Sequence, residues 1–392
     1  MAERAEINPK VLRWARETAR IDVEAAAAKA NVPAEKLQEW ESGTSFPTVR
    51  QAQNLAKAYK RPFALLFLAE IPRDFQPLRD FRTKGSTPLS TASIFIIREI
   101  QQKQAWIAEV NQEDGEPQAP FIGRFSISDD PTRVANDILA TFEIDPANYP
   151  GTPIKQWIDR AESNGIFISR TSFIHSRLTL DAEEFQGFAI ADPHAPFVFI
   201  NSDDYDAPQL FTLVHEIAHL WIAATGISND IDDFDPQHPR DRDPVERFCN
   251  EVAAKALIPD KVFNRLPDST FVSADAALRQ ARVLGVSSFA LLVRAYKAKR
   301  ISLDEYQRVK ADADRAFQEF LKREADKKAR QKASESSGGP NYYLLKVNRN
   351  SRLFTQTVLD AYRQGYIEPT TASSLLDVQV NRFPKLEEQL YR

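Results

Sequence analysis

The spacing of apolar positions over residues 9–68 predicts a bundle of short helices. Apolar residues recur near every 3.6 positions in "PKVLRWARETAR", "DVEAAAAKA", "PAEKLQEWESG" and "TVRQAQNLAKAYK", with caps or breakers between these segments. The segment "RPFALLFL" closes the bundle. Two short helices joined by the tight turn "NV", with three supporting helices, predict a five-helix helix-turn-helix bundle within residues 1–70.

Beyond this bundle the pattern predicts helices and a small amount of strand. The Pro-rich stretch 71–88 indicates a connector, and a long helix is expected from about Leu89 to Val110. "IFISR" predicts a strand, and "FQGFAIADPHAPFVFIN" predicts a β-hairpin because two alternating apolar runs flank "DPHAP". A helix starting near Pro208 follows, and then an acidic, Pro-rich loop over Gly226–Asp243. The expected fold class is therefore α+β and mostly helical.

Helical patterns dominate the rest of the chain. "PVERFCNEVAAKALIP" predicts one helix, residues 274–299 predict a helix–turn–helix pair, and "NYYLLKV" opens a further helical segment. The charged run "LKREADKKARQKASESSGGP" changes from helix-like to linker-like. The predicted parts are the bundle (1–70), a connector and helical region (71–150), a core with the hairpin (151–265), a helical subdomain (266–325), a linker (326–340) and a C-terminal helical segment (341–392).

Composition narrows the classes of protein to consider. The net charge of −4 argues against a global basic field of the kind that binds nucleic acid. The single cysteine, Cys249, excludes an intramolecular disulfide and fits a reducing compartment. No apolar run approaches the roughly 20 residues of a membrane helix, and the first residues do not form a secretory signal. We therefore expect a soluble, cytoplasmic protein.

The stretch "LVHEIAHLW" carries the most specific chemical signal. His215 and His219 are four residues apart, so on a helix both imidazoles lie on one face and can bind one ion. Glu216 lies at the edge of that face, where it can reach a water molecule on the metal. This spacing is the H-E-x-x-H motif, which is typical of zinc peptidases. The plainer alternative is a buried helix whose histidines bond to the backbone.

A catalytic zinc needs a third protein ligand, and the best candidate is Glu246. Asn250 lies one turn further on, where an amide can orient a ligating histidine. The alternative for Glu246 is structural, because "DPVE" also fits a capping box with Glu at the third helical position. His238 is a weaker candidate, either as a rival ligand or as an oxyanion-stabilising group. We expect His175 and His194 to lie in loops or turns. Cys249 is expected to be a small residue of the hydrophobic core.

The segments "GFAIADPHAPFVFIN", "FTLVHEIAHLWI" and "ERFCNEVAAKALIP" together resemble the ImmA/IrrE zinc metallopeptidases. The resemblance implies a zincin-like peptidase core with a small β-hairpin or sheet. It also implies a gluzincin-like zinc site in which His215, His219 and Glu246 are ligands, Glu216 is the general base and Asn250 supports a ligand. Members of the family are soluble regulators, and characterised ones cleave or inactivate a partner repressor. The resemblance therefore implies a protein substrate here as well, such as a transcriptional repressor.

The segment "VEAAAAKANVPAEKLQEWESGTSFPTVRQAQNLAKAY" is similar to Xre-type helix-turn-helix domains, which implies DNA binding. The expected recognition helix, Pro33–Glu41, departs from a typical base-reading helix because it is acidic. Only Lys36 and Gln38 are suited to contact DNA. Two functions therefore stay open: a zinc endopeptidase coupled to transcription or stress regulation, or a DNA-binding or antitoxin-like regulator with a structural metal site. A protein-docking role for the N-terminal bundle is a further alternative.

Overall fold

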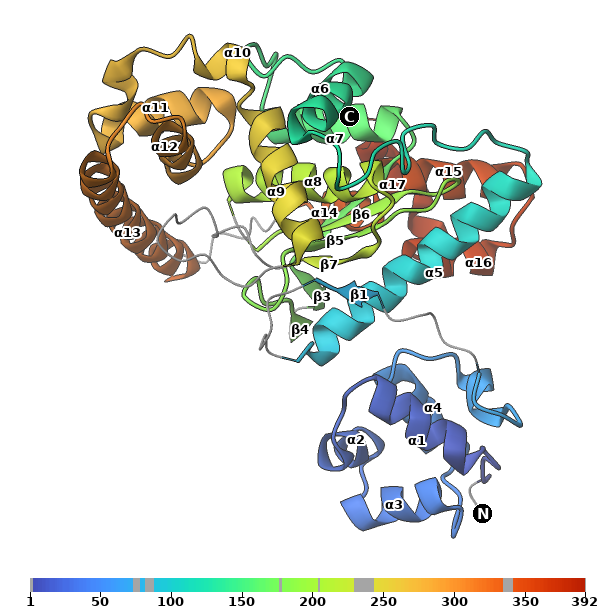
Figure 1. The fold of residues 1–392 in the computed structure, drawn as a ribbon. Helices are drawn as coiled ribbons and strands as arrows, with labels where there is room; N and C mark the ends of the chain where they lie inside the picture. The colour runs from blue at the N-terminus through green and yellow to red at the C-terminus, as the bar shows by residue number, and fades with distance from the viewer. Residues whose placement is uncertain are drawn as a thin grey trace. The chain divides into compact units, whose positions relative to one another are not determined.

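The structure is a computed structural model of residues 1–392 (Figure 1), and it describes residues 3–72, 78–81, 88–175, 178–203, 205–228, 243–333 and 341–391. The chain divides into two compact units, which are considered separately. The first unit comprises Met1–Pro77, Thr87–Gln102 and Phe173–Leu180. The second unit comprises Leu78–Ser86, Lys103–Ser172 and Asp181–Arg392. The long helix α5 (Thr91–Glu113) contributes its first half to the first unit and its remainder to the second.

The first unit begins with short helices in the places that the apolar spacing predicts. They are α1 (Pro9–Thr18), α2 (Val23–Ala30), α3 (Ala34–Ser42), α4 (Val49–Ala58) and the 3-10 helix η1 (Phe63–Phe67). Local capping fixes their ends: Asp22 accepts a hydrogen bond from the Ala25 N–H, and Thr48 and Gln51 form a capping box. The same unit contains a short antiparallel pair, β3 (Phe173–His175) and β4 (Leu178–Thr179).

Within the described part of the second unit, a mixed sheet of five short strands forms the framework. The strands are β1 (Arg79–Asp80), β2 (Phe167–Thr171), β5 (Gly187–Ile190), β6 (Phe197–Asn201) and β7 (Gly226–Ser228). Their order is β1-β7-β5-β6-β2. The β5–β6 pairing is antiparallel, so the predicted hairpin is confirmed. Parallel pairing joins β2 to β6 and β1 to β7, and the sequence pattern did not predict either pairing.

Helices cover this sheet and carry the candidate site. The helices that precede or follow the strands are α6 (Pro131–Phe142), α7 (Pro153–Ser163), α8 (Asp206–Trp221) and α9 (Pro244–Leu257). Helix α8 packs on β5 and β6, and α9 packs along α8 (Figure 1). A buried aromatic group that includes Trp221, Phe121 and Phe142 anchors the end of α8. Because α8 is held on both sides, its side chains have fixed positions above the sheet.

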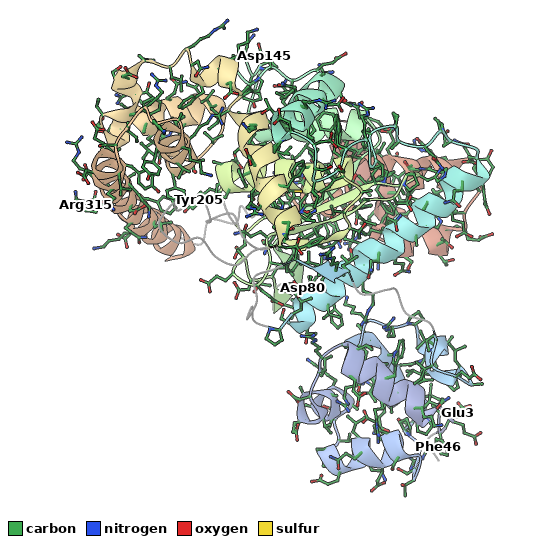
Figure 2. The ribbon with its side chains drawn as sticks, in the orientation of Figure 1. Glu3, Phe46, Asp80, Asp145, Tyr205 and Arg315 are labelled. Atoms are coloured by element: carbon green, nitrogen blue, oxygen red, sulfur yellow. The ribbon has the colours of Figure 1, made fainter. Side chains whose placement is uncertain are left out.

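The remaining helices of the second unit follow the predicted helical segments. They are α10 (Asp260–Phe263), η2 (Asp268–Phe271), α11 (Ala274–Leu284), α12 (Ser288–Lys297), α13 (Leu303–Ala333), α14 (Tyr342–Asn350), α15 (Arg352–Arg363), α16 (Pro369–Leu376), η3 (Val380–Arg382) and α17 (Phe383–Leu390). Helices α14 and α15 pack against strand β2. Figure 2 adds the side chains to the same view of these elements.

The structure corrects three of the predicted boundaries. Residues 226–228 of the expected loop form strand β7, because pairing with β5 and β1 satisfies their backbone. Helix α8 begins at Asp206 rather than near Pro208, since proline is tolerated in a first helical turn. Helix α13 continues to Ala333, so residues 326–333 of the expected linker are helical.

The described residues contain no single helix that is long and apolar enough to cross a membrane. Helices α11 and α12 reach that length and apolarity only as a pair, and a bend of 103° separates them.

Candidate metal centre

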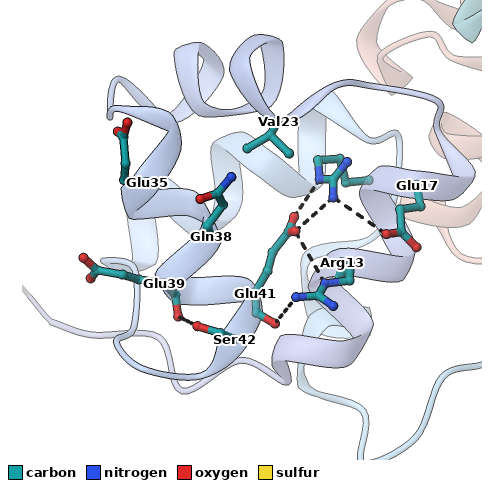
Figure 3. Close-up of a pocket in the computed structure, with 9 residues that line it drawn as sticks. Arg13, Glu17, Val23, Glu35, Gln38, Glu39, Glu41 and Ser42 are labelled. Atoms are coloured by element: carbon teal, nitrogen blue, oxygen red, sulfur yellow. Dashed lines mark hydrogen bonds and ion pairs between the residues drawn. The ribbon is translucent and has the colours of Figure 1, made fainter.

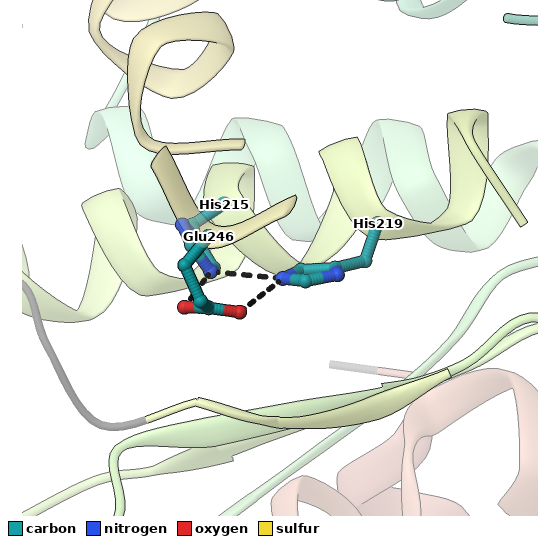
Figure 4. A group of neighbouring side chains, drawn as sticks. All are labelled: His215, His219 and Glu246. Atoms are coloured by element: carbon teal, nitrogen blue, oxygen red, sulfur yellow. Dashed lines mark hydrogen bonds and ion pairs between the residues drawn. The ribbon is translucent and has the colours of Figure 1, made fainter. Parts of the chain in front are cut away.

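Two histidines of α8 direct their rings to the same point. His215 and His219 lie one helical turn apart, and their Nε2 atoms are 3.0 Å from each other (Figure 4). Both side chains are buried, as are all the residues of α8 from Gln209 to Trp221. The apolar residues around the pair fix its position between the sheet and α9, so the two nitrogens meet in a site with little freedom to rearrange.

Helix α9 brings a carboxylate to the same point. Glu246 Oε1 is 3.0 Å from His219 Nε2, and Glu246 Oε2 is 3.3 Å from His215 Nε2. Glu246 occupies the third position of α9, but the side chain that caps this helix is Asp243, which accepts from the Val245 N–H at 2.9 Å. The Glu246 carboxylate faces the imidazoles, so its position in this structure is that of a candidate ligand.

The three side chains fit the geometry of a zinc site. Their donor atoms all lie within 4.8 Å of one another, and all three residues are buried. Zinc bonds of ~2.0–2.1 Å in a tetrahedron place ligand atoms about 3.3 Å apart, and the observed separations are 3.0 to 3.3 Å. Two imidazoles with one carboxylate also form a donor set that zinc accepts in catalytic sites. Among the described residues, this group is therefore the candidate metal centre.

The carboxyl group of Glu216 lies beside this centre and has unusual surroundings. Neither of its oxygens has a hydrogen bond of normal length and angle among the described residues, although the side chain is fully buried and Ser228 favours its ionised form. Burial raises the pKa of Glu216 to about 8; the positive charge of His215 opposes this change, and the negative charge of Glu246 adds to it. A buried carboxyl group without a partner is costly, which is typical of a functional group whose partner is a bound water or substrate.

Charge interactions tie the candidate ligands together. Burial alone would raise the pKa of the Glu246 carboxyl, but the two imidazoles outweigh burial and hold this pKa below its usual range. Burial lowers the pKa of His219, so this ring tends to be neutral. Burial opposes the charged form of His215, but the charge of Glu246 and its hydrogen bond raise the pKa of this ring. Metal binding would displace that proton, because a neutral imidazole and an ionised carboxylate are the states in which these side chains bind a metal ion.

Two further polar residues support the candidate ligands. Asn250, one turn after Glu246 on α9, is buried and helps to raise the pKa of His215, which matches the position predicted for a group that orients a histidine. Ser228 Oγ donates to Glu246 Oε1 at 3.2 Å and lies 3.5 Å from His219 Nε2. Sequence reasoning missed Ser228 because it belongs to the three-residue strand β7, which is too short to produce an alternating pattern.

An aromatic residue distant in sequence also contacts the centre. Phe81, which follows strand β1, stacks on His219 with ring centroids 5.3 Å apart and an interplanar angle of 28°. Arg79 Nη2 bonds to Asp243 Oδ2 at 2.8 Å, so the same segment contacts the cap of the helix that carries Glu246. The Pro-rich composition of residues 71–88 did not predict the contact between Phe81 and His219.

The other histidines and the cysteine lie away from the centre or outside the description. His238 is outside the described residues, as is most of the acidic loop around it. His194 lies in the turn between β5 and β6, as expected, with its Nε2 atom 3.3 Å from the Gln118 amide. His175 ends strand β3 rather than lying in a loop. Cys249 is a buried residue of α9, and burial raises the pKa of its thiol well above the usual value.

The N-terminal candidates for DNA contact lie on α3, in the first unit. Lys36 Nζ bonds to Glu39 Oε2 at 2.5 Å, so a carboxylate already neutralises its charge. Gln38 lines a shallow hollow of about 580 Å³ between α1, α2 and α3 (Figure 3). Glu41 is turned inward, where Arg16 Nε donates to it at 2.7 Å. The exposed side of α3 therefore carries one lysine against two glutamates, Glu35 and Glu39, and is less acidic than the sequence count indicates.

Comparison with known proteins gives evidence on this site that is independent of its geometry. A search of curated proteins finds no match to the chain. Residues 161–296, which include the hairpin β5–β6, the two histidines of α8 and Glu246 of α9, match the family model Peptidase_M78, described as the IrrE N-terminal-like domain. This part of the chain is therefore similar to the metallopeptidases of the ImmA/IrrE kind.

Proposed function

We propose that the protein is a zinc-dependent endopeptidase. The observation that carries the proposal is the meeting of His215, His219 and Glu246 around one point, beside the buried and unpartnered carboxyl of Glu216. The match of residues 161–296 to a metallopeptidase family supports it independently. A structural zinc site has four protein ligands and no position for a reacting molecule. The described residues offer three ligands together with an acid, which is the composition of a hydrolytic centre.

Each side chain has a separate role in this proposal. His215, His219 and Glu246 would hold a zinc ion, which would supply Lewis acidity to a scissile carbonyl and to a water molecule. Glu216 accepts the proton of the attacking water and returns it to the departing amine. A divalent cation nearby favours the ionised form of Glu216, which opposes the effect of burial. Asn250 and Ser228 hold His215 and Glu246 in their ligating orientations.

The proposed substrate is a specific protein, such as a transcriptional repressor or another regulatory partner. The support is the likeness to the ImmA/IrrE family together with the short-helix bundle at the N-terminus. The protease would then act in transcription or stress regulation. We propose that the bundle contributes by binding DNA weakly through Lys36 and Gln38. The Lys36–Glu39 ion pair supports low affinity, because the lysine must leave a carboxylate before it meets a phosphate.

The alternative function is a DNA-binding regulator with a structural metal site. That function gives no role to Glu216, since a structural site needs no base. A buried acid without hydrogen bonds destabilises the fold, and its presence beside three candidate ligands favours the enzyme.

The experiment that tests the proposal compares the wild type with Glu216→Gln. Both proteins are analysed for zinc and incubated with a peptide library made from a proteolysed cell extract, and new peptide termini are identified by mass spectrometry. We expect one zinc per chain in both proteins and new termini with the wild type alone, because glutamine cannot accept the proton. Equal cleavage by the variant, or loss of zinc together with cleavage, would contradict the division of roles.

A further inference from the structure

Ser228 lies opposite Gly187 where strands β7 and β5 pair. Residues that face each other across two antiparallel strands direct their side chains to the same side of the sheet. A Cβ built on Gly187 would meet Thr212 and Glu216 of α8, so this side of the sheet is the one that α8 covers. The backbone holds the pair in place, because the Gln186 N–H donates to the Ser228 carbonyl at 3.1 Å. The side chain of Ser228 therefore points toward the helix that carries Glu216.

The hydroxyl group of Ser228 has three neighbours in the candidate metal centre. Its Oγ atom donates to Glu246 Oε1 at 3.2 Å and lies 3.5 Å from His219 Nε2. It is also close enough to Glu216 to lower the pKa of that carboxyl against the larger effect of burial, which is the direction expected of a donor beside a carboxylate. Ser228 itself is buried. A single hydroxyl group thus adjoins two carboxylates and an imidazole.

This hydroxyl can donate to only one of the two carboxylates at a time, because it has a single proton. In this structure the proton goes to Glu246, and neither oxygen of Glu216 has a hydrogen bond of normal length and angle among the described residues. Glu246 has other partners, since the imidazoles of His215 and His219 lie 3.3 and 3.0 Å from its oxygens. A buried carboxylate that lacks a donor gains more from one hydrogen bond than a carboxylate that already has partners.

We propose that Ser228 is a positioning residue for both carboxylates, and that its hydroxyl turns from Glu246 to Glu216 when the centre holds a metal ion. The cation would satisfy the oxygens of Glu246, and rotation about the Ser228 Cβ–Oγ bond redirects the proton without moving the strand. Glu216 then has a donor that fixes the orientation of its carboxylate. The general base is thereby oriented in the metal-loaded protein alone. This inference rests on the proposed metal centre, but its test does not require peptide cleavage.

The test is a double-mutant cycle with zinc affinity as the readout. The full-length wild type, Ser228→Ala, Glu216→Gln and the protein with both changes are freed of metal. The dissociation constant of zinc is then measured for each protein in competition with a chelating dye. Two further variants are controls. Ser228→Thr keeps the hydroxyl group, and Ser169→Ala removes a buried hydroxyl on β2 that donates to the Arg349 carbonyl instead.

If the hydroxyl turns to Glu216, its loss matters most while position 216 carries a carboxylate. We expect Ser228→Ala to weaken zinc binding on the order of tenfold when Glu216 is present, which is the scale for groups that support a metal site. In the Glu216→Gln background the same change is expected to weaken zinc binding by about twofold at most, because a neutral amide gains less from the donated bond than a carboxylate. Ser228→Thr and Ser169→Ala are expected to bind zinc as the wild type does.

Four results would overturn the inference. Equal weakening in both backgrounds would show that Ser228 supports Glu246 alone, and an unchanged affinity in Ser228→Ala would show that the hydroxyl supports neither carboxylate. Weakening in Ser228→Thr as large as in Ser228→Ala would assign the effect to packing. Equal weakening in Ser169→Ala would assign it to a general loosening of the sheet. A wild type that binds no zinc would overturn the proposed metal centre as well, and this result is distinguishable from the other four.

Discussion

The carboxyl group of Glu216 lies against the backbone of Gly187. A Cβ built on Gly187 would be 3.0 Å from Glu216 Oε1, 2.8 Å from Thr212 Cγ2 and 2.9 Å from the Phe199 carbonyl oxygen. Strand β5 thus approaches α8 closely enough to set the position of Glu216, and only a residue without a side chain permits that approach.

We predict that Gly187→Ala lowers peptide cleavage while zinc stays bound. The added methyl group must displace Glu216, and a displacement of about 1 Å costs on the order of 100-fold in rate when a proton-transfer group is misplaced. Zinc analysis and cleavage of the same peptide library measure the two effects. Gly151→Ala is the control, since a Cβ at Gly151 meets no atom within 4 Å. Full activity in Gly187→Ala would contradict the positioning role.

Glu162 gives a prediction about stability and pH. Its Oε1 atom accepts hydrogen bonds from Ser351 Oγ at 2.6 Å and from the Arg352 N–H at 3.0 Å, at the start of α15. Burial nevertheless raises the pKa of this carboxyl above its ordinary value. The neutral form is therefore favoured in the folded state, and its contribution to stability is complete below the unfolded pKa and is lost as the pH rises through the folded pKa.

We therefore expect Glu162→Gln to gain stability relative to the wild type as the pH rises from 4 towards neutrality, because glutamine stays neutral and still accepts hydrogen bonds. Glu162→Ala is expected to lose about 1–3 kcal/mol, since it leaves buried donors of α15 without an acceptor. Urea unfolding at several pH values gives both results. The control is the exposed Glu116→Gln. A pH-independent difference between Glu162→Gln and the wild type would be evidence against the raised pKa.

The acidic side of α3 gives a prediction about DNA. We expect weak, salt-dependent binding that is lost when residues 1–70 are deleted, because the proposed contacts Lys36 and Gln38 lie there. Glu39→Gln frees Lys36 from its ion pair and removes a negative charge, so it should tighten binding and steepen the salt dependence by about one unit. Binding to duplex DNA at two salt concentrations measures this. Glu24→Gln, an exposed position on α2, is the control. Equal DNA affinity without residues 1–70 would contradict the assignment.

Elements with a clear local period could be predicted from the sequence, and so could the residues that they place on one face. Helices α1 to α4, α8 and α9 and the hairpin β5–β6 have such periods. His215 and His219 are brought together by α8 alone, so their meeting follows from helix geometry. Glu246 reaches the two histidines once α9 packs on α8, and the apolar face of α9 favours this packing.

The missed residues depend on pairing between segments that are far apart in the chain. Strand β1 pairs with β7 across about 150 residues, and each has only two or three residues, so neither shows an alternating pattern. Phe81 and Ser228 acquire their places beside His219 and Glu246 through this pairing alone. Gly187 has a role only because α8 lies above it. These positions have no signal in a single sequence because the tertiary fold, not a local preference, determines them.

The zinc content of Glu246→Gln tests the central claim most directly. A neutral amide is a poor ligand for zinc, whereas glutamine replaces glutamate with little cost at the third position of a helix. Glu251→Gln, an exposed change on the same helix, is the matched control, and His219→Ala is the reference for loss of a ligand. We predict one zinc per chain in the wild type and in Glu251→Gln, and strongly reduced zinc in Glu246→Gln and His219→Ala. Stoichiometric zinc in Glu246→Gln would contradict the metal centre described here.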